Sequence, residues 1–217
     1  IRTTDSTVAT ALRTIVVLAG AWGMVFIVGS QADLTHLDAR SIGLLVLSGL
    51  ATGASWLCYF KALQLGDVSR VTPVDKMSTV LTVIMAVALL GEDLGALGAL
   101  GLVLVTAGTL LMLRAEDLRA LPRALAGGGG WLLYALGAAL FAALTAILGK
   151  AGITGVESNL GTAIRTGVVL VMAWVMVAVT GKLRDVRSVP RGELGFVLAS
   201  GAATCASWLC YYRALQD

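Results

Sequence analysis

Ionisable side chains inside apolar runs are the residues of this 217-residue sequence that could do chemistry. Arg13 lies about two turns into one run, Lys61 in the last turns of another, and Asp75 and Lys76 at the start of a third, just after Pro73. A charge at the centre of a lipid bilayer costs at least about 2.5 kcal/mol, so such groups are expected to serve a function. We predict a polar cluster in which Asp75 pairs with Arg13 or Lys61 and a surplus cation meets an anionic or zwitterionic molecule.

Simpler interpretations of the same residues stay open. Lys61 and Lys76 can extend their ammonium groups to the membrane interface, with Asp75 capping or neutralising them. Pro73 is harmless at a helix start, where its missing N–H has no helical partner. Alternatively, it interrupts the helix and makes TPVDK (72–76) part of a gate, as broken helices do in carriers.

Aromatic residues recur in two copies of one string, SWLCYF (55–60) and SWLCYY (207–212). Trp56 and Tyr59 of the first copy correspond to Trp208 and Tyr211 of the second. Rings with polar tips that lie well inside a membrane span need a protein or cavity partner for the N–H or O–H group. We expect these four rings to line a cavity, with simple helix packing as the alternative.

The composition predicts an all-α membrane protein. Hydrophobic residues make up 58% of the chain, charged residues 13%, and the mean hydropathy is +0.89. An ordinary soluble domain has about 25% charged residues. The alternating pattern of a membrane β-barrel does not occur. We expect seven membrane helices, at about residues 7–29, 40–64, 71–90, 94–113, 131–150, 159–181 and 192–216.

An internal duplication organises these helices. An offset of 152 aligns residues 1–65 with 153–217 without a gap, and 29 of the 65 positions are identical, including Arg13 with Arg165. We therefore predict a first repeat over 1–113 that lacks its first helix, an exposed linker over 114–130, and the first three helices of a second repeat over 131–217. The expected complete protein has two five-helix halves.

Loop charges predict that the two halves are inverted. A repeat with an odd number of helices enters the membrane in the opposite direction the second time, and cytoplasmic loops carry the excess of Lys and Arg. Residues 30–40 contain one such cation, whereas the equivalent residues 182–191 contain four. We expect the basic loop, and with it Ile1, to lie on the cytoplasmic side.

Residues 51–113 resemble the end of an EamA domain of the drug/metabolite transporter superfamily. The most specific strings are SWLCYFKALQLG, VTPVDK with LLGE, and GLVLVTAG. The resemblance extends to residues 131–217, which repeat the start of the domain. It implies a ten-helix carrier, built from two inverted EamA domains, that moves small metabolites or drug-like solutes and often exports them.

Other functional classes fit less well. A receptor-like or structural membrane protein is the alternative to a carrier. An enzyme is not expected, because one histidine and scattered carboxylates supply no convincing catalytic group. Neither a cofactor nor a metal is expected, and the net charge of +3 gives no reason to expect a nucleic-acid partner. The expected partners are a small-molecule substrate and the lipid bilayer of a bacterial inner membrane, and homodimer formation stays open.

Overall fold

Helices make up the computed structural model of this chain over the residues that it describes, 4–112 and 130–216. Six of them are long and apolar enough to cross a membrane, and the seventh, α4, is shorter. The chain is thus an integral, multi-pass, all-α membrane protein, as the composition predicts. The predicted linker 114–130 lies outside the described residues, except Gly130, which begins α6. The elements are α1 (Ser6–Val28), η1 (Ser30–His36), α2 (Ala39–Leu65), α3 (Val68–Met85), η2 (Ala86–Leu90), α4 (Ala96–Met112), α6 (Gly130–Ile153), α7 (Ser158–Val179), η4 (Asp185–Ser188) and α8 (Arg191–Gln216).

Equivalent residues of the duplication delimit α1 and α7. Asp5 caps α1 by accepting a hydrogen bond from Thr7 N at 2.9 Å, and Glu157, 152 positions later, caps α7 by accepting from Leu160 N at 3.0 Å. Such side chains satisfy backbone donors that a helix start leaves unpaired. Both helices are followed by a glycine in the left-handed region, Gly29 with φ 83° and Gly181 with φ 72°. Glycine reaches this conformation without a steric penalty. The two helices end within one equivalent position of each other, at Val28 and at Val179.

Two compact units divide the chain. The first comprises Ile1–Leu50 with Leu148–Asp217, and the second comprises Ala51–Ile147. The boundaries fall within α2 and α6, so each of these helices contributes residues to both units.

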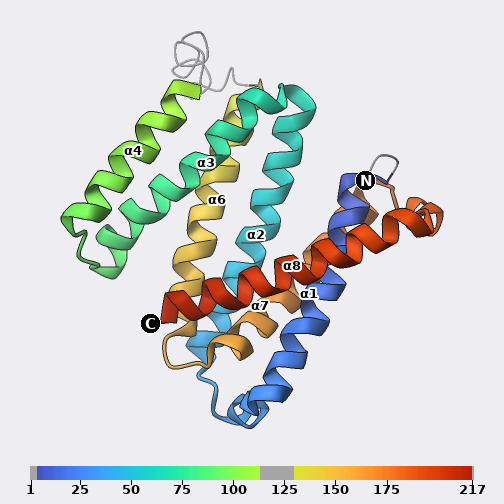
Figure 1. Ribbon diagram of the computed structural model, residues 1–217, viewed down its shortest axis with the longest axis horizontal. Helices are drawn as coiled ribbons and strands as arrows, with labels where there is room; N and C mark the ends of the chain where they lie inside the picture. Colours follow the sequence, from blue (N-terminus) through green and yellow to red (C-terminus); the bar gives the residue numbers. More distant parts are fainter. Residues whose placement is uncertain (1–3, 113–129, 217) are drawn as a thin grey trace. The chain divides into compact units, whose positions relative to one another are not determined.

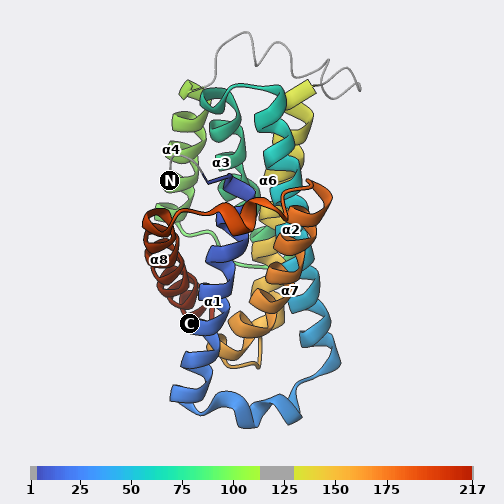
Figure 2. The same cartoon turned by 90° about the vertical axis from the view of Figure 1, so that its right-hand side faces the viewer.

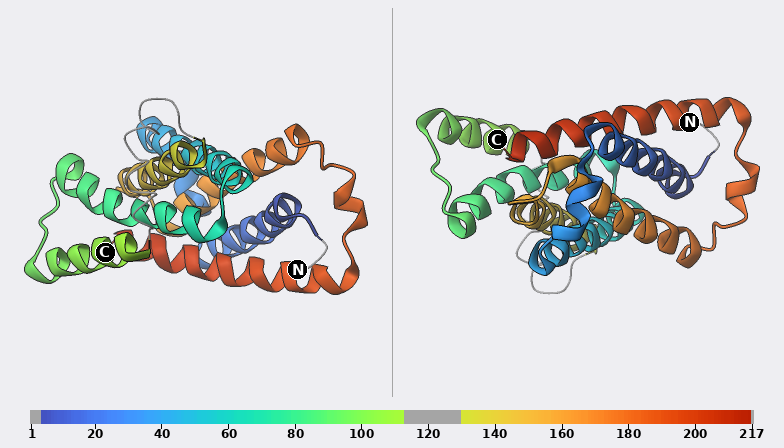
Figure 3. Two further views of the ribbon diagram at one scale, coloured as in Figure 1. Left: turned by 90° about the horizontal axis from the view of Figure 1, so that it is seen from above. Right: turned by 90° about the horizontal axis from the view of Figure 1, so that it is seen from below.

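In the first unit, α1 and α7 lie side by side and run in opposite directions (Figures 1 and 2). The end of α1 packs on the start of α7, where Ala21 and Val25 share an apolar cluster with Leu160 and Ala163. The start of α1 meets the residues that follow α7. Helix α8 packs against α1 and also contacts α7, and Figure 3 shows it running alongside α1.

In the second unit, α3 and α4 form a neighbouring pair connected through the π-helix η2 and a short turn (Figure 1). Its core contains Ala62 of α2, Val71 and Val74 of α3, and Leu132 and Ala135 of α6. These small and branched apolar side chains allow the three helices to approach closely, which favours packing in a membrane.

The boundaries of the third and fourth helices correct the sequence-based prediction. Helix α3 begins at Val68, three residues before the expected 71, so Pro73 is the sixth helical residue and is buried. The helix continues through Pro73, and the departure from α-helical geometry occurs at 86–90 instead. Helix α4 begins at Ala96 rather than at 94.

Candidate functional site

Side chains from two other helices surround Arg165 on α7. Its side chain is buried, with the whole residue only 4% exposed. The Nε–H group donates to Ser48 Oγ of α2 at 3.1 Å. The guanidinium carbon lies 4.8 Å from the ring centroid of Trp208 and 5.1 Å from that of Tyr212, both on α8. At such distances the electron-rich ring faces attract a cation.

Helix α6 closes this region from a further side. A Cβ atom added to Gly149 would lie 2.8 Å from Tyr212 Oη and 3.3 Å from Ser48 Oγ. One added to Gly152 would lie 3.0 Å from Leu45 Cγ. Glycine at these two positions therefore lets the α6 backbone pack directly against the groups around Arg165.

Arg13 on α1 is the sequence equivalent of Arg165 and has different surroundings. It is half-buried and lines a cavity of about 60 Å³ together with Ala9, Thr10, Val197 and Ser200. Ser200 is the sequence equivalent of Ser48, because 48 plus 152 is 200. Within the described part of the first unit, the Arg13 side chain makes no hydrogen bond or ion pair.

The backbones beside the two arginines make matching contacts. A Cβ atom added to Gly49 would lie 2.7 Å from Val168 Cβ and 3.1 Å from Arg165 O. One added to Gly201 would lie 2.7 Å from Val16 Cβ and 3.1 Å from Arg13 O. Replacing both residues of one contact by the residues at the equivalent positions, 152 apart in the sequence, gives the other contact. Such reciprocity is the signature of a two-fold relation.

The antiparallel arrangement places the two arginines at opposite ends of the α1–α7 pair. Each is the eighth residue of its helix. At 1.5 Å per residue, each lies about 10 Å from the start of a helix roughly 34 Å long. Because the starts point in opposite directions, the pair presents one arginine toward each end.

The predicted polar cluster around Asp75 is not formed in the described part of the second unit. Asp75 is half-buried and makes no hydrogen bond or ion pair there. Lys61 is exposed and its Nζ donates to Gln64 Oε1 of the same helix at 3.5 Å, and Lys76 is exposed. The exposed Lys61 side chain extends along its own helix instead of to Asp75. Arg13 belongs to the first unit, and its pairing with Asp75 stays a prediction.

The structure separates the predicted aromatic residues. Trp208 contacts Arg165, whereas Tyr211 is 44% exposed and lies edge-on to Tyr212, with ring centroids 5.4 Å apart. Sequence reasoning selected Tyr211 and missed Tyr212. In the second unit, Tyr59 packs against the apolar core, and Trp56 is half-buried.

Two signals in the sequence point to Tyr212. Residues four apart lie on the same face of a helix, so Tyr212 follows Trp208 on one face. Position 212 is also where the second string departs from the first, with tyrosine in place of Phe60. The change adds a hydroxyl group, and a buried hydroxyl needs a hydrogen-bonding partner. Ser48 and Ser200 were missed because a single serine in an apolar run carries little information.

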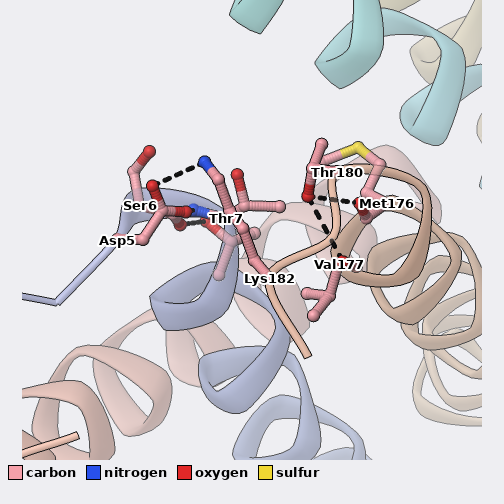
Figure 4. Close-up of polar contacts among 8 residues, drawn as sticks. Asp5, Ser6, Thr7, Met176, Val177, Thr180 and Lys182 are labelled. Atoms are coloured by element: carbon pink, nitrogen blue, oxygen red, sulfur yellow. Dashed lines mark hydrogen bonds and ion pairs between the residues drawn. The ribbon is translucent and has the colours of Figure 1, made fainter. Parts of the chain in front are cut away.

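An ion pair joins the start of α1 to the residues after α7 (Figure 4). Lys182 Nζ lies 2.6 Å from Asp5 Oδ2. Burial raises the pKa of the Asp5 carboxyl, but hydrogen bonds from Lys182 and Thr7 and the charge of Lys182 outweigh it, so the pKa lies below its usual value. Position 30, the equivalent of 182, is a serine, so this ion pair has no counterpart at the other end.

No group of three metal-ligating side chains occurs within residues 4–112 and 130–216. The three cysteines are free: Cys58 is half-buried, Cys205 buried and Cys210 exposed. The polar groups around Arg165 and Arg13 in the first unit can supply hydrogen bonds and positive charge. That chemistry suits the binding of a solute.

Comparison with known proteins gives two matches. Residues 1–114 match the EamA-like transporter family. A protein of Sinorhizobium sp. described as "Uncharacterized transporter in cobO 3'region" is 44% identical over 108 residues, which cover 50% of this chain and 77% of that protein. No solved structure matches the chain.

Proposed function

The chain belongs to the EamA-like transporter family and is a membrane transporter, and we propose that it moves a small polar metabolite or drug-like solute by alternating access. In this mechanism the two repeats take opposite orientations in the membrane and expose the solute to each side in turn. The proposal includes a bacterial inner-membrane location.

The antiparallel packing of α1 and α7 is the observation that carries this proposal. These helices derive from the same part of the duplicated sequence, and both are long enough to span a bilayer. The contact of α7 with α2 and that of α1 with α8 are related by a two-fold relation. Two spanning helices that run in opposite directions cross the membrane with opposite topology. In a carrier with inverted repeats, the conformation open to one side of the membrane and the conformation open to the other side can interconvert, because the two halves swap conformations.

Our proposed solute-contacting or gating residues come from both repeats: Arg13, Trp56, Tyr59, Lys61, Pro73, Asp75, Lys76, Arg165, Trp208 and Tyr211. Within the first unit, Arg13 and Arg165 are the central pair, because Arg165 donates to Ser48 of the other repeat and Arg13 lines a cavity together with Ser200 of the other repeat. We add Tyr212 to this set because its ring faces Arg165.

Accessibility of single cysteines tests the inverted arrangement. Thr35 and Arg187 are equivalent positions on the exposed connections after α1 and α7, and the native cysteines are first replaced by alanine. In intact cells, a membrane-impermeant maleimide should label Thr35→Cys and spare Arg187→Cys, and inverted vesicles should give the reverse result. Labelling of both positions from one side would rule out inversion.

Solute flux tests transport itself. The purified chain is placed in liposomes, and entry of labelled amino acids, organic acids, nucleosides and sugars is followed with and without an internal pool of the same solute. A carrier should give saturable entry that an internal pool accelerates. Entry equal to that of protein-free liposomes for all four solute classes would contradict the proposal.

A further inference from the structure

We propose that the polar contacts between the start of α1 and the residues after α7 form a latch that makes the two transport conformations unequal in free energy. The latch consists of the ion pair between Asp5 and Lys182 and the hydrogen bonds from Thr4 to Glu193. It favours the conformation that is closed at this end of the α1–α7 pair. The inference rests on the proposed alternating access.

Two contacts join the repeats at the latch. Lys182 Nζ lies 2.6 Å from Asp5 Oδ2 (Figure 4). One residue earlier, Thr4 donates to Glu193 Oε2 in the first turn of α8, from its backbone N at 3.0 Å and from Oγ1 at 2.5 Å. Hydrogen bonds with one ionised partner are roughly twice as strong as those between neutral groups. The segment before α1 is therefore held at two points of the second repeat.

Capping interactions position both members of the ion pair. Asp5 accepts a hydrogen bond from Thr7 N through Oδ1, so its other oxygen, Oδ2, is the one that meets Lys182. The backbone N–H group of Lys182 donates to Val177 O at 3.0 Å. This bond spans six residues, as in the Schellman motif that ends many helices. Because the two helix ends already fix both backbones, forming the pair costs less conformational freedom than a pair between two unrestrained residues.

The other end of the α1–α7 pair lacks both contacts. The positions equivalent to those of the latch, 152 residues away in the sequence, are Val156, Glu157, Ser30 and Ser41. Val156 belongs to the apolar cluster at that end, and Glu157 forms no ion pair within the described part of the first unit. Of the four positions, three are thus charged at the latch and one at the other end. The two-fold relation of the backbones does not extend to these side chains.

Unequal ends have a consequence for alternating access. When two inverted halves swap conformations, each contact at one end is replaced by its equivalent at the other end. A contact that both ends can form contributes equally to the two conformations. A contact that only one end can form stabilises only the conformation closed at that end. With the predicted orientation, the latch lies on the cytoplasmic side and favours closure there.

Salt is expected to weaken the latch. Asp5 precedes the first residue of α1 and Lys182 follows the end of α7, so the ion pair lies at the membrane surface and not within a span. Raising the ionic strength from about 0.01 M to about 1 M shortens the Debye length from about 30 Å to about 3 Å. Apolar contacts are not screened in this way. Salt sensitivity therefore separates a charged latch from simple helix packing.

Distances between spin labels test the proposal in liposomes that contain the full chain. After the native cysteines are replaced by alanine, labelled cysteines at exposed positions 6 and 187 report on the latch end, and those at 35 and 154 report on the other end. The shorter latch-end distance should predominate. Lys182→Ser introduces the residue of the equivalent position 30. It should lower the ratio of short to long latch-end distances by about 1.5- to 5-fold.

Further variants separate the latch from general charge effects. Asp5→Asn keeps a side chain that can cap α1 and should cause a similar shift. Combining it with Lys182→Ser should add nothing, because both changes remove the same ion pair. Arg184→Ser removes an exposed cation from the same connection and should leave the ratio unchanged. Salt at about 1 M should lower the ratio in the unmutated chain but not in Lys182→Ser. If the variants fail to insert, the salt response of the unmutated chain still decides the question.

Two results would overturn the latch: a latch-end ratio that neither Lys182→Ser nor salt changes, and a shift in Arg184→Ser as large as that in Lys182→Ser. The distance at the other end distinguishes this inference from the proposed function. A latch-end shift without the opposite change between positions 35 and 154 would support the ion pair and contradict alternating access. Opposite changes at the two ends during solute exchange, unaffected by Lys182→Ser, would support alternating access and contradict the latch.

Discussion

Arg13 and Arg165 occupy equivalent positions in the duplicated sequence but have different surroundings. Arg165 is buried between Ser48, Trp208 and Tyr212, whereas Arg13 is half-buried beside a cavity. The backbone contacts next to the two arginines are nearly identical. The difference therefore comes from side chains and from α6, whose end packs into the region around Arg165.

The comparison separates two uses of a buried cation. A guanidinium enclosed by a hydroxyl and aromatic faces gains interactions that offset the cost of leaving water, so it can stabilise the fold. The Arg13 guanidinium makes no hydrogen bond or ion pair with the described part of its own unit, so it gains less from this part of the protein. We therefore expect Arg165 to contribute more than Arg13 to the stability of this chain.

The largest expected difference is in the alanine variants of the two arginines. Arg165→Ala loses a charge-assisted hydrogen bond, two cation–π contacts and packing, partly offset by removal of a buried charge. We expect the free energy of unfolding in mixed detergent micelles to fall by about 2–3 kcal/mol. Arg13→Ala should change it by less than about 1 kcal/mol. Equal losses in the two variants would show that the surroundings seen here do not determine stability.

Alanine at the paired glycines should give intermediate effects and sharpen the two-fold relation. A new Cβ at Gly49 or Gly201 would lie 2.7 Å from a valine Cβ, so neighbouring backbones must shift. Each variant should lose about 1–3 kcal/mol of unfolding free energy. Gly43→Ala is the matched control, since nothing lies within 4 Å of its added Cβ, and it should be neutral or slightly stabilising. If only one of the Gly49 and Gly201 variants loses unfolding free energy, the two-fold relation would describe the sequence but not the stability of the two contacts.

The smallest expected effect concerns the ion pair that occurs at one end of the α1–α7 pair. The lowered pKa of Asp5 means that its contribution is present above the ordinary carboxyl pKa of 3.8 and is lost as pH falls through the lower folded value. At pH 7, Asp5→Asn should reduce unfolding free energy by less than about 1 kcal/mol, because the pair is partly exposed. The difference from the wild-type chain should shrink as pH falls below 3.8 and vanish only below the lowered folded pKa. Asp33→Asn on η1 serves as the exposed control, and a constant difference from pH 7 to pH 3 would exclude the ion pair as the cause.

Much of the helical fold could be predicted because it depends on long apolar runs and on a gapless repeat. Six expected spans correspond to helices that can cross a membrane, and the duplication identified Arg13 with Arg165 before any contact was known. The exact start of α3 was harder to predict, because this helix begins in the polar stretch before Pro73, where hydrophobicity gives no signal.

The environments of the candidate site residues could not be predicted from one sequence. Whether Lys61 turns toward Asp75 or toward Gln64 depends on rotamers and on the packing of neighbouring helices, not on spacing alone. Identical residues predict identical surroundings only where the helices around them are also equivalent. The end of α6, the first helix of the second repeat, packs against the groups around Arg165 at Gly149 and Gly152, and residues 1–113 contain no equivalent of α6.

The antiparallel contact between α1 and α7 also sets the order of events during synthesis. Equivalent positions of the two helices are 152 residues apart, and ribosomes add about 5–20 residues per second. Helix α1 must therefore wait roughly 8–30 s in the membrane before α7 emerges, and somewhat longer for the part of α8 that carries Ser200. During that interval Arg13 resides in a helix that has none of its final neighbours from the second repeat. During that interval the strongly apolar sequence of α1 must hold the helix in the bilayer without any contact from the second repeat.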